Sequence, residues 1–401
     1  MKKNHSPKTP SSAEPLSPIH AKDYAALPAE QRKVYRPVDP KYERLPRFCY
    51  ALYGVALISL VIYVLFSFSP AFADFFNQNI SSVGRSFLNL LTCRIPFSLG
   101  EACVWLLPAV LILSLIHAVR HRCDTWRGAL TYLGILLSVV SVLFSLFSLN
   151  FAAGYRGTGL DQKLGLDRRD VSAAELYETA ELLRAQINEE TASILYAEDG
   201  FSVMPYSLDT LNDKLNEAYT DFCATHDFIS HVNGQFKPVL ISEAMSYMHI
   251  TGVYSFFTGE ANVNVNFPDY TLPFTAAHEM AHQRGIARED EANFVAYLVC
   301  ISSNDAYVRY SGYLNMYEYV VNALYSADYE SFCKVSAHLN SEVKGEISAY
   351  NAFFKTYANS TASKVSGTVN NTFLQSQGTP GTKSYGMVVD LAVAYYRDPE
   401  A

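Results

Sequence analysis

The stretch Leu272–Phe294, LPFTAAHEMAHQRGIAREDEANF, decides the fold and the chemistry of the C-terminal region. His278 and His282 are four residues apart, so a helix places both imidazoles on one face, as two ligands of a tetrahedral zinc require. Glu279 lies beside the first histidine, where its carboxylate can reach a zinc-bound water. Zinc lowers the pKa of such a water toward about 7, and Glu279 can take its proton and pass it to a leaving amine. The spacing predicts a Zn²⁺ site with His278 and His282 as metal ligands and Glu279 as the catalytic base.

A third protein ligand is expected on the next helix. Gly285 can end the motif helix in a left-handed conformation, and the acidic run after it can start a second helix. Glu291, in the first turns of that helix, is predicted to face back toward the histidines and complete the metal site. Glu289 and Asp290 have the same chemistry, but carboxylates at a helix start usually cap the helix or face solvent. Glu291 is therefore the predicted third metal ligand.

The simplest alternative is an exposed helix that carries two unremarkable histidines. The apolar residues in and around the motif, Phe274, Ala277, Met280 and Ala281, favour a buried helix instead. A buried helix with three unpaired ionisable groups costs free energy, and a bound metal removes that cost. The apolar surroundings therefore favour a real metal site.

Three long apolar segments set the N-terminal part of the chain apart, although only 17% of the whole chain is charged. Phe48–Ser69 has 22 residues without a charge, which as a helix reaches about 30 Å, the thickness of a bilayer's hydrocarbon core. Ala102–Val119 has a strongly apolar core, and Gly128–Tyr155 has 28 uncharged residues. We predict three transmembrane helices within residues 48–155, which excludes a simple soluble enzyme.

The basic residues beside these segments predict the orientation of the chain. Met1–Arg47 carries ten Lys or Arg against five Asp or Glu, and Arg120–Arg127 carries three Arg, whereas Pro70–Glu101 has two Arg balanced by two acids. Because Lys and Arg favour the cytoplasmic side, both basic segments should be cytoplasmic and Arg156–Ala401 should lie outside a cell membrane that the chain crosses several times. With eight prolines and no hydrophobic periodicity, residues 1–47 are expected to be a disordered basic cytosolic tail.

Residues 156–401 are predicted to form a mainly helical α+β domain with a small sheet. Phe236–Ile241 and Ala261–Phe267 are expected to be strands, because in the second of these asparagines alternate with apolar residues. Asn359–Ser384 is expected to be a looser segment. Helices are expected at Asp170–Leu195, Ser207–Phe228, Pro273–Arg284, Arg288–Ser302, Ala306–Ser326, Ser331–Thr356 and Met387–Arg397.

Several segments besides the motif carry a recognisable pattern: Pro96–Glu101, Phe257–Asn266, Glu289–Phe294 and Arg309–Tyr313. With the HEMAHQ core they resemble DUF3810, an uncharacterised family of bacterial membrane proteins that is regarded as zincin-like. The similarity covers roughly residues 50 to 397. It implies a zincin fold and peptidase activity, but no particular substrate. The Glu-Ala-Asn step that follows the motif is similar to the third-ligand segment of other Glu-type zinc peptidases, which supports Glu291.

In zincins generally, a strand edge above the motif helix pairs with the extended substrate. The strand around residues 261–266 is expected to take this role, with Asn262 and Asn264 either contacting substrate or facing water. Tyr310, in the segment RYSGY, is expected either to donate a hydrogen bond to the oxyanion of the tetrahedral intermediate or to pack in the core. Glu260 is expected to be a turn or strand-end carboxylate rather than a fourth ligand.

We therefore expect a membrane-anchored zinc metallopeptidase that hydrolyses peptide bonds in an extracytoplasmic protein or peptide. The alternative is a non-catalytic binding or sensor module with a structural zinc. Glu279 argues against that module, because structural sites usually fill the fourth position with Cys or His. The expected partners are the lipid bilayer and the peptide substrate. Nucleic acid is excluded because residues 156–401 carry sixteen Lys or Arg against thirty-one Asp or Glu.

Overall fold

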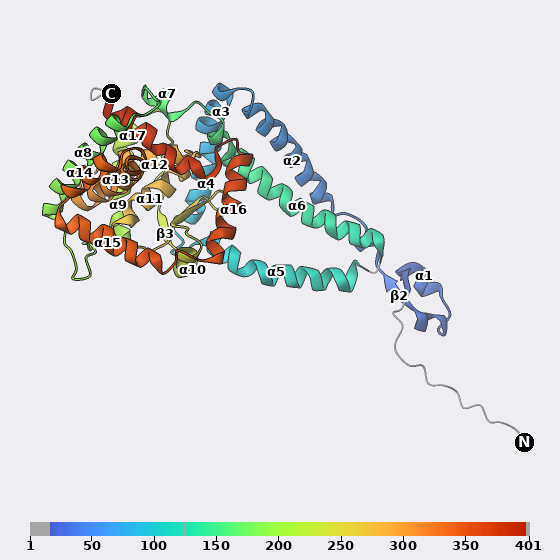
Figure 1. Cartoon of the computed structure of the whole chain (residues 1–401). Helices are drawn as coiled ribbons and strands as arrows, with labels where there is room; N and C mark the ends of the chain where they lie inside the picture. Colours follow the sequence, from blue (N-terminus) through green and yellow to red (C-terminus); the bar gives the residue numbers. More distant parts are fainter. Residues whose placement is uncertain (1–16, 124, 398–401) are drawn as a thin grey trace, which may run out of the picture. The chain divides into compact units, whose positions relative to one another are not determined.

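The computed structural model describes residues 17–123 and 125–397, which form two compact units (Figure 1). The first unit contains Trp105–Leu143 and the described part of Met1–Leu57. The second contains Ile58–Val104 and the described part of Phe144–Ala401. The second unit therefore begins within the first apolar helix and not at residue 156, where the sequence placed the start of the outer domain.

Within residues 17–123 and 125–397, three helices are long and apolar enough to cross a membrane, as the sequence predicted. They are α2 Arg47–Phe66, α5 Leu99–His121 and α6 Trp126–Asn150 (Figure 1). Many of their large apolar side chains are exposed, which suits helices that face lipid. α6 ends before the predicted limit at residue 155, because residues 152–155 form a buried 3-10 turn. These helices indicate membrane association, and the side of the membrane on which each end lies stays a prediction.

The N-terminal segment that we expected to be disordered contains regular structure in its described part. β1 Ser17–His20 pairs in parallel with β2 Tyr35–Val38, and α1 Ala21–Ala26 lies between them in the sequence. Residues 1–16 of the expected tail lie outside the described residues. Residues 17–47 therefore include short regular elements, which the sequence pattern did not indicate.

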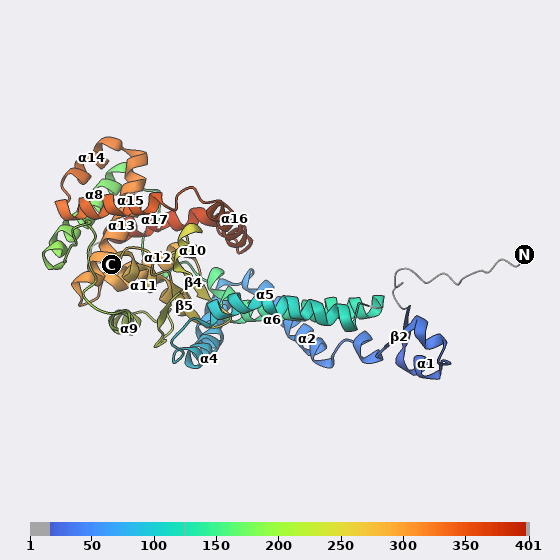
Figure 2. The ribbon, with the colours of Figure 1, turned by 90° about the horizontal axis from the view of Figure 1, so that it is seen from below.

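The second unit is mainly helical and contains one small sheet, as the sequence predicted. Figures 1 and 2 show α11 in the interior of this unit, with α12 and α13 beside it. Its helices are α3 Pro70–Phe76, α4 Ser82–Thr92, α7 Leu160–Leu164, α8 Ala173–Glu190, α9 Leu208–Thr225, α10 Ser242–Tyr247, α11 Thr271–Gln283, α12 Glu289–Ile301, α13 Ala306–Ala327, α14 Tyr329–Ala337, α15 Ser341–Lys355, α16 Thr361–Ser376 and α17 Val388–Arg397. Short turns of helix occur at η3 Asn77–Ser81, η4 Ala152–Tyr155, η5 Thr191–Ser193 and η6 Gly381–Met387.

Capping residues explain where several helices begin. Ser172 and Ser207 each accept a hydrogen bond from the backbone N–H three residues on, so α8 and α9 start where the sequence predicted. The last long predicted helix is two helices instead, α14 and α15. The segment expected to be loose, residues 359–384, contains α16. Ser360 caps this helix and Leu374 is buried, so a cap and packing outweigh the low helix propensity of its Gly, Ser, Thr and Asn residues.

The sheet has three strands in the order β3-β5-β4, which are Phe236–Pro238, Glu260–Val263 and Gly252–Ser255. β5 pairs in parallel with β3 and antiparallel with β4, so β5 is the central strand and β4 lies at the edge. The prediction that the strand around residues 261–266 offers a free edge is therefore wrong, and β4 takes that position. All of β5 is buried, because α11 packs against the sheet, and Figure 2 shows α4 beside it.

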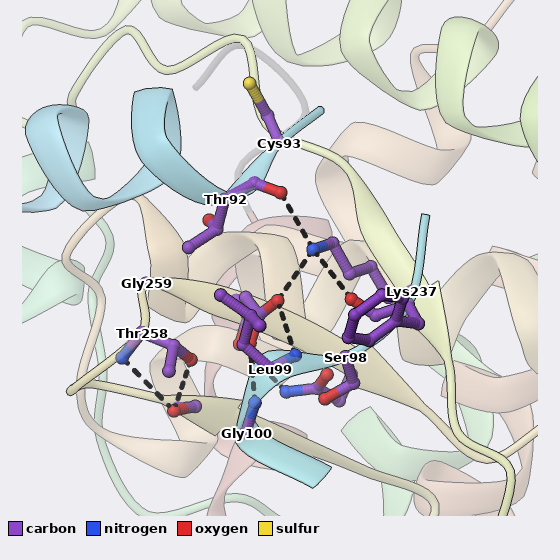
Figure 3. Close-up of polar contacts among 12 residues, drawn as sticks. Thr92, Cys93, Ser98, Leu99, Gly100, Lys237, Thr258 and Gly259 are labelled. Atoms are coloured by element: carbon purple, nitrogen blue, oxygen red, sulfur yellow. Dashed lines mark hydrogen bonds and ion pairs between the residues drawn. The ribbon is translucent and has the colours of Figure 1, made fainter. Parts of the chain in front are cut away.

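A buried ion pair ties this sheet to the start of α5 (Figure 3). Lys237 Nζ lies 2.6 Å from Glu260 Oε1. It also donates to the carbonyl oxygen of Thr92, the last residue of α4, at 2.9 Å and to that of Phe97, just before α5, at 3.1 Å. The Glu260 carboxylate accepts hydrogen bonds from the backbone N–H groups of Leu99 and Gly100, at 3.0 and 2.8 Å. Glu260 is thus a strand-end carboxylate, as predicted, and it binds the free N–H groups of the first turn of an apolar helix.

The segment Arg309–Tyr313 on α13 positions the two helices of the motif. Ser311 Oγ donates to a carbonyl just before α11 and accepts from Phe274 N at 3.1 Å, which fixes the first turn of α11. Gly312 permits the close approach of α12, because an added Cβ would lie 2.6 Å from Cys300 Cβ. This part of the recognisable sequence pattern therefore serves the packing of α11 and α12.

Candidate metal centre

α11 is buried along its whole length and is held near both of its ends. Tyr219 on α9 donates a hydrogen bond to the Ala277 carbonyl at 2.5 Å. Arg284, just past the helix, donates to the Met280 carbonyl at 3.1 Å and lies 3.9 Å from the centre of the Tyr219 ring. Gly285 has a φ of +99°, which lets the chain turn sharply into α12. These contacts bring the start of α12 against the face of α11 that carries the histidines.

His278, His282 and Glu289 form a buried group that could hold a metal ion. Each residue offers one ligand atom, and these atoms lie within 4.8 Å of one another. Glu289 Oε2 lies 3.3 Å from His278 Nε2 and 3.5 Å from His282 Nε2. The two imidazole nitrogens and the carboxylate oxygen therefore converge on one place, as a tetrahedral site with three protein ligands requires.

A backbone carbonyl sets the tautomer of His282. Nδ1 of this ring lies 2.6 Å from the Ile286 carbonyl oxygen, which can only accept a hydrogen bond. Nδ1 therefore carries a hydrogen, which leaves Nε2 as the ring nitrogen that can bind a metal in exchange for a proton. The rings of Phe151 and Tyr254 lie with their centres 5.7 and 6.4 Å from the imidazole and enclose it.

The charges at the centre favour a cation. Burial lowers the pKa of His282, but the carboxylates of Glu289 and Glu279 raise it to about 9. Burial raises the pKa of Glu289, but His282 and His278 lower it further than burial raises it, so this carboxylate stays negative in the interior. Burial also raises the pKa of Glu279 to about 7, against the opposing effect of the two histidines. A carboxyl group with such a pKa can both accept and release a proton near neutral pH.

The third ligand predicted from the sequence, Glu291, does not lie with the histidines. Its Oε1 accepts hydrogen bonds from a backbone N–H at 3.0 Å and from Arg288 Nη1 at 3.0 Å. Asp290 accepts from Arg168 Nη2 at 3.0 Å. Successive helical residues point roughly 100° apart, so the three acids at the start of α12 face three directions. Glu289 is the acid that faces the histidines, and it replaces Glu291 in the metal site.

Glu279 lies against the edge strand of the sheet. A Cβ added to Gly252, the first residue of β4, would lie 2.5 Å from Glu279 Oε1. Within the described part of the chain, Glu279 Oε2 is buried without a hydrogen-bond partner, and so is His278 Nδ1. A buried polar atom without a partner costs free energy, and such an atom beside metal-ligand atoms is well placed to bind water or substrate.

Asn262 and Asn264 are buried in the sheet, with exposed fractions of 3% and 1%. The Asn262 amide donates to two backbone carbonyls, one of them that of Val253 on β4. The Asn264 amide donates to Ser246 Oγ at 3.0 Å and to the Ile250 carbonyl at 2.9 Å. These asparagines therefore hold β4 and α10 in place, and their geometry does not support the expected substrate contact.

Tyr310 also serves the packing of the unit and does not reach the metal centre. Its ring is fully buried and its hydroxyl donates to Glu346 Oε2. A tyrosine that the sequence did not indicate, Tyr385 in η6, lies near the centre. Burial raises the pKa of Tyr385, and the negative charges of Glu289 and Glu279 raise it further. No local pattern marked Tyr385, because packing brings it from about a hundred residues after the motif.

The family model described as a protein of unknown function, DUF3810, matches residues 76–393 of the chain. These residues include the three strands, α4, α11, α12 and η6. No curated protein and no solved structure matches the chain.

Proposed function

Because this chain belongs to the DUF3810 family, whose description assigns no activity, we propose from its metal centre that it is a membrane-anchored zinc metallopeptidase with a zincin-like domain. The observation that carries the proposal is the buried group of His278, His282 and Glu289 beside Glu279, one of whose oxygens has no partner among the described residues. A metal with three protein ligands keeps one position open, and an adjacent base is what a hydrolytic centre needs.

The donor atoms fit zinc. Two imidazole nitrogens and one carboxylate oxygen form a ligand set that catalytic zinc sites use. His282 would bind through Nε2, because its Nδ1 is engaged with a carbonyl, and Glu289 would bind through Oε2. Zinc, when bound, supplies a Lewis acid and makes water a nucleophile near neutral pH.

Side chains around the metal would transfer protons and stabilise the negative charge that forms during hydrolysis. Glu279 would accept a proton from the attacking water at Oε2 and deliver it to the leaving amine. Tyr385 accepts a hydrogen bond from Asn370 Nδ2 at 3.3 Å, so its own O–H can donate to the negative charge that develops on the substrate carbonyl oxygen. The outer edge of β4 would pair with an extended peptide. Since Gly252 touches Glu279, this pairing would bring a peptide bond next to the base.

The substrate would be an extracytoplasmic protein or peptide. The basic residues that precede α2 and those between α5 and α6 support this side, because such residues favour the cytoplasm. A cysteine placed at Lys364, on the exposed face of α16, tests it in cells whose chain lacks the native cysteines. Labelling by a membrane-impermeant thiol reagent in intact cells is the expected result. Labelling only after permeabilisation would place α16 in the cytoplasm.

The function is tested on the full-length protein in lipid nanodiscs. The wild type should hold about one zinc per chain and cleave members of a defined mixture of unstructured peptides, as followed by mass spectrometry. Glu279→Gln should keep the zinc and lose at least about 100-fold in cleavage rate. A wild type that holds zinc but cleaves nothing, with Glu279→Gln identical to it, would favour the binding module with a structural metal. A folded wild type that takes up no zinc would contradict both.

A further inference from the structure

α4, which lies between α2 and α5 in the sequence, buries its polar face and exposes its apolar face. In η3 and α4, the residues that face the interior of the second unit are polar and recur every three or four positions: Ser81, Arg85, Asn89 and Thr92. The opposite face is apolar, with side chains between 46 and 66% exposed: Ile80, Val83, Phe87, Leu90 and Leu91. A surface helix of a soluble protein buries its apolar stripe and exposes its polar one. The pattern of α4 suits a helix that packs its polar face on the protein and places its apolar face in an environment less polar than water.

The polar face of α4 makes hydrogen bonds with other parts of the second unit. Arg85 donates to Asn77 Oδ1 and to the Asn150 carbonyl, both at 2.8 Å, and to Ser230 Oγ at 3.2 Å. Asn89 donates to the backbone carbonyl just before Gly234 at 3.0 Å. These bonds fix the rotation of the helix, so its apolar face cannot turn inward without breaking them.

The position of α4 in the chain limits what can cover its apolar face. Residues 67–98 connect α2, which ends at Phe66, with α5, which begins at Leu99, and both of these helices are candidate membrane spans. A chain that leaves one span and enters the next does so at the same membrane surface. α4 therefore lies in the segment that connects two helices whose apolar side chains are also exposed. Figure 2 shows α4 at the periphery of the second unit, beside the sheet.

We propose that α4 is an interfacial helix, whose apolar face enters the lipid at the membrane surface where α2 ends and α5 begins. The occupant of this face is the acyl-chain region of the bilayer, into which such helices reach about 5–10 Å. Arg94, exposed just after α4, is placed to meet lipid headgroups. The polar face then holds the metal-bearing unit against the membrane.

This placement brings the metal centre close to the lipid. Gln283, the residue after His282, donates to Asn89 Oδ1 at 3.3 Å and to the Gly259 carbonyl at 2.8 Å. One helix layer, about 10 Å, therefore separates the end of α11 from the bilayer. If the proposed function holds, its substrates are peptide segments that lie at the membrane surface. This last point rests on the proposed peptidase, whereas the lipid contact of α4 does not.

Tryptophan fluorescence in the full chain tests the lipid contact. Trp105 and Trp126 are first changed to Phe, so that a single tryptophan at Phe87→Trp reports on α4. The matched control is Tyr329→Trp, at a side chain that is 61% exposed on α14. Each protein is reconstituted in phosphatidylcholine vesicles with brominated acyl chains and is also titrated with acrylamide. Circular dichroism and gel filtration verify the fold, and Leu90→Trp is a second probe if Phe87→Trp does not fold.

The expected result is that brominated lipid lowers the emission of the α4 probe at least twofold while acrylamide has little effect, with the reverse for the control. Quenching of both probes by acrylamide alone would show that α4 faces water and would overturn the proposal. Quenching of the α4 probe by neither agent would show that protein covers this face, for instance a second copy of the chain, and would overturn it equally. Because the readout needs no catalysis, it stands or falls apart from the proposed function.

Discussion

Two buried glutamates of the second unit have opposite surroundings. Glu346 on α15 accepts hydrogen bonds from Ser202 N at 2.9 Å, from Ser202 Oγ at 2.5 Å and from the Tyr310 hydroxyl. Glu279 on α11 is equally enclosed, yet within the described residues its Oε2 has no partner. Burial alone therefore does not distinguish a structural acid from a functional one. The difference lies in hydrogen bonding, because native interiors rarely leave a carboxylate oxygen unpaired without a reason.

The surroundings differ in a second respect. Glu346 is bonded by neutral donors, whereas Glu279 shares its site with two imidazoles and the Glu289 carboxylate, whose ligand atoms converge. Neutral donors complete the Glu346 site without any ligand. The convergent atoms at α11 could hold a cation, and we propose that a cation completes this site. The following predictions separate these two kinds of site.

The largest expected effect is on metal affinity. Glu289→Ala removes one of three proposed zinc ligands and should weaken zinc binding by more than about 100-fold. Loss of a residue that only hydrogen-bonds to a ligand typically weakens metal binding by about 10- to 100-fold. Glu291→Ala, two residues along the same helix turn, should change the affinity far less, because its carboxylate binds Arg288 and a backbone N–H. Competition with a chelator on the full-length protein measures both. Loss of zinc in Glu291→Ala with retention in Glu289→Ala would restore the original sequence-based prediction.

A large effect on turnover is expected at Tyr385. Tyr385→Phe removes the proposed donor to the oxyanion and should lower kcat/KM by about 100-fold with zinc content unchanged. Tyr310→Phe is the matched control, since that hydroxyl bonds Glu346. It should leave kcat/KM near the wild-type value. Equal losses in the two variants would remove the special role of Tyr385.

A smaller loss of turnover is expected when the space beside Glu279 is filled. Gly252→Ala places a Cβ about 2.5 Å from Glu279 Oε1, so the carboxylate must move. Displacement of a catalytic group by such an amount should lower kcat/KM by about 10- to 100-fold, with zinc retained. Gly345→Ala on α15 has nothing within 4 Å of its added Cβ and should keep full activity. Unchanged turnover in Gly252→Ala would show that Glu279 is not positioned by β4.

A change at Glu346, whose carboxylate is fully hydrogen-bonded, should lower the stability of the protein and leave catalysis unchanged. Glu346→Gln keeps the shape of the side chain but turns an N–H₂ group toward Ser202 or Tyr310, which both donate to this site. A mismatched buried hydrogen bond of this kind costs about 1–3 kcal/mol. Thermal unfolding of the detergent-solubilised protein should show the loss, while kcat/KM per folded chain stays unchanged. A loss of activity without a loss of stability would contradict the division between the two sites.

The smallest effect concerns pH. Burial and the neighbouring Glu346 raise the pKa of Glu318 from 4.5 to about 7. Below pH 4.5 this group is protonated in both folded and unfolded chains. As the pH rises toward 7 the unfolded chain loses the proton first, so the free energy of unfolding falls, by about 1–2 kcal/mol when partial exposure is allowed for. Glu318→Gln should remove this part of the decline between pH 5 and 8 in thermal unfolding. If the free energy of unfolding of Glu318→Gln fell with pH as much as that of the wild type, the pKa of Glu318 would not be raised by burial.

The features that the sequence predicted well depend on local pattern. Charge-free runs indicated α2, α5 and α6, and the four-residue spacing of His278 and His282 placed both on one face of α11. Helical periodicity also predicted α8 and α9 to within a few residues of their starts. Each of these signals operates within one helix, so it survives whatever tertiary arrangement the chain adopts.

The features that the sequence missed depend on geometry between elements. The choice between Glu289 and Glu291 follows from the turn at Gly285, after which Arg288 is the N-cap residue and Glu289 the first residue of α12. β4 lies at the edge because β3 pairs in parallel with β5 and not with β4, the next strand in the sequence. Tyr385, in η6, is close enough to Glu289 and Glu279 for their charges to raise its pKa, and it comes from a distant part of the sequence. The inverted polarity of α4 becomes visible once its buried face is known.

X-ray absorption at the zinc edge of the zinc-loaded, full-length protein tests the metal centre most directly. We expect nitrogen and oxygen ligands at about 2.0–2.2 Å, with the outer-shell signature of two imidazoles. A spectrum of Glu291→Ala should be the same, and Glu289→Ala should hold no stoichiometric zinc. A sulfur ligand at about 2.3 Å, or a folded wild-type protein that binds no zinc, would contradict the assignment of His278, His282 and Glu289.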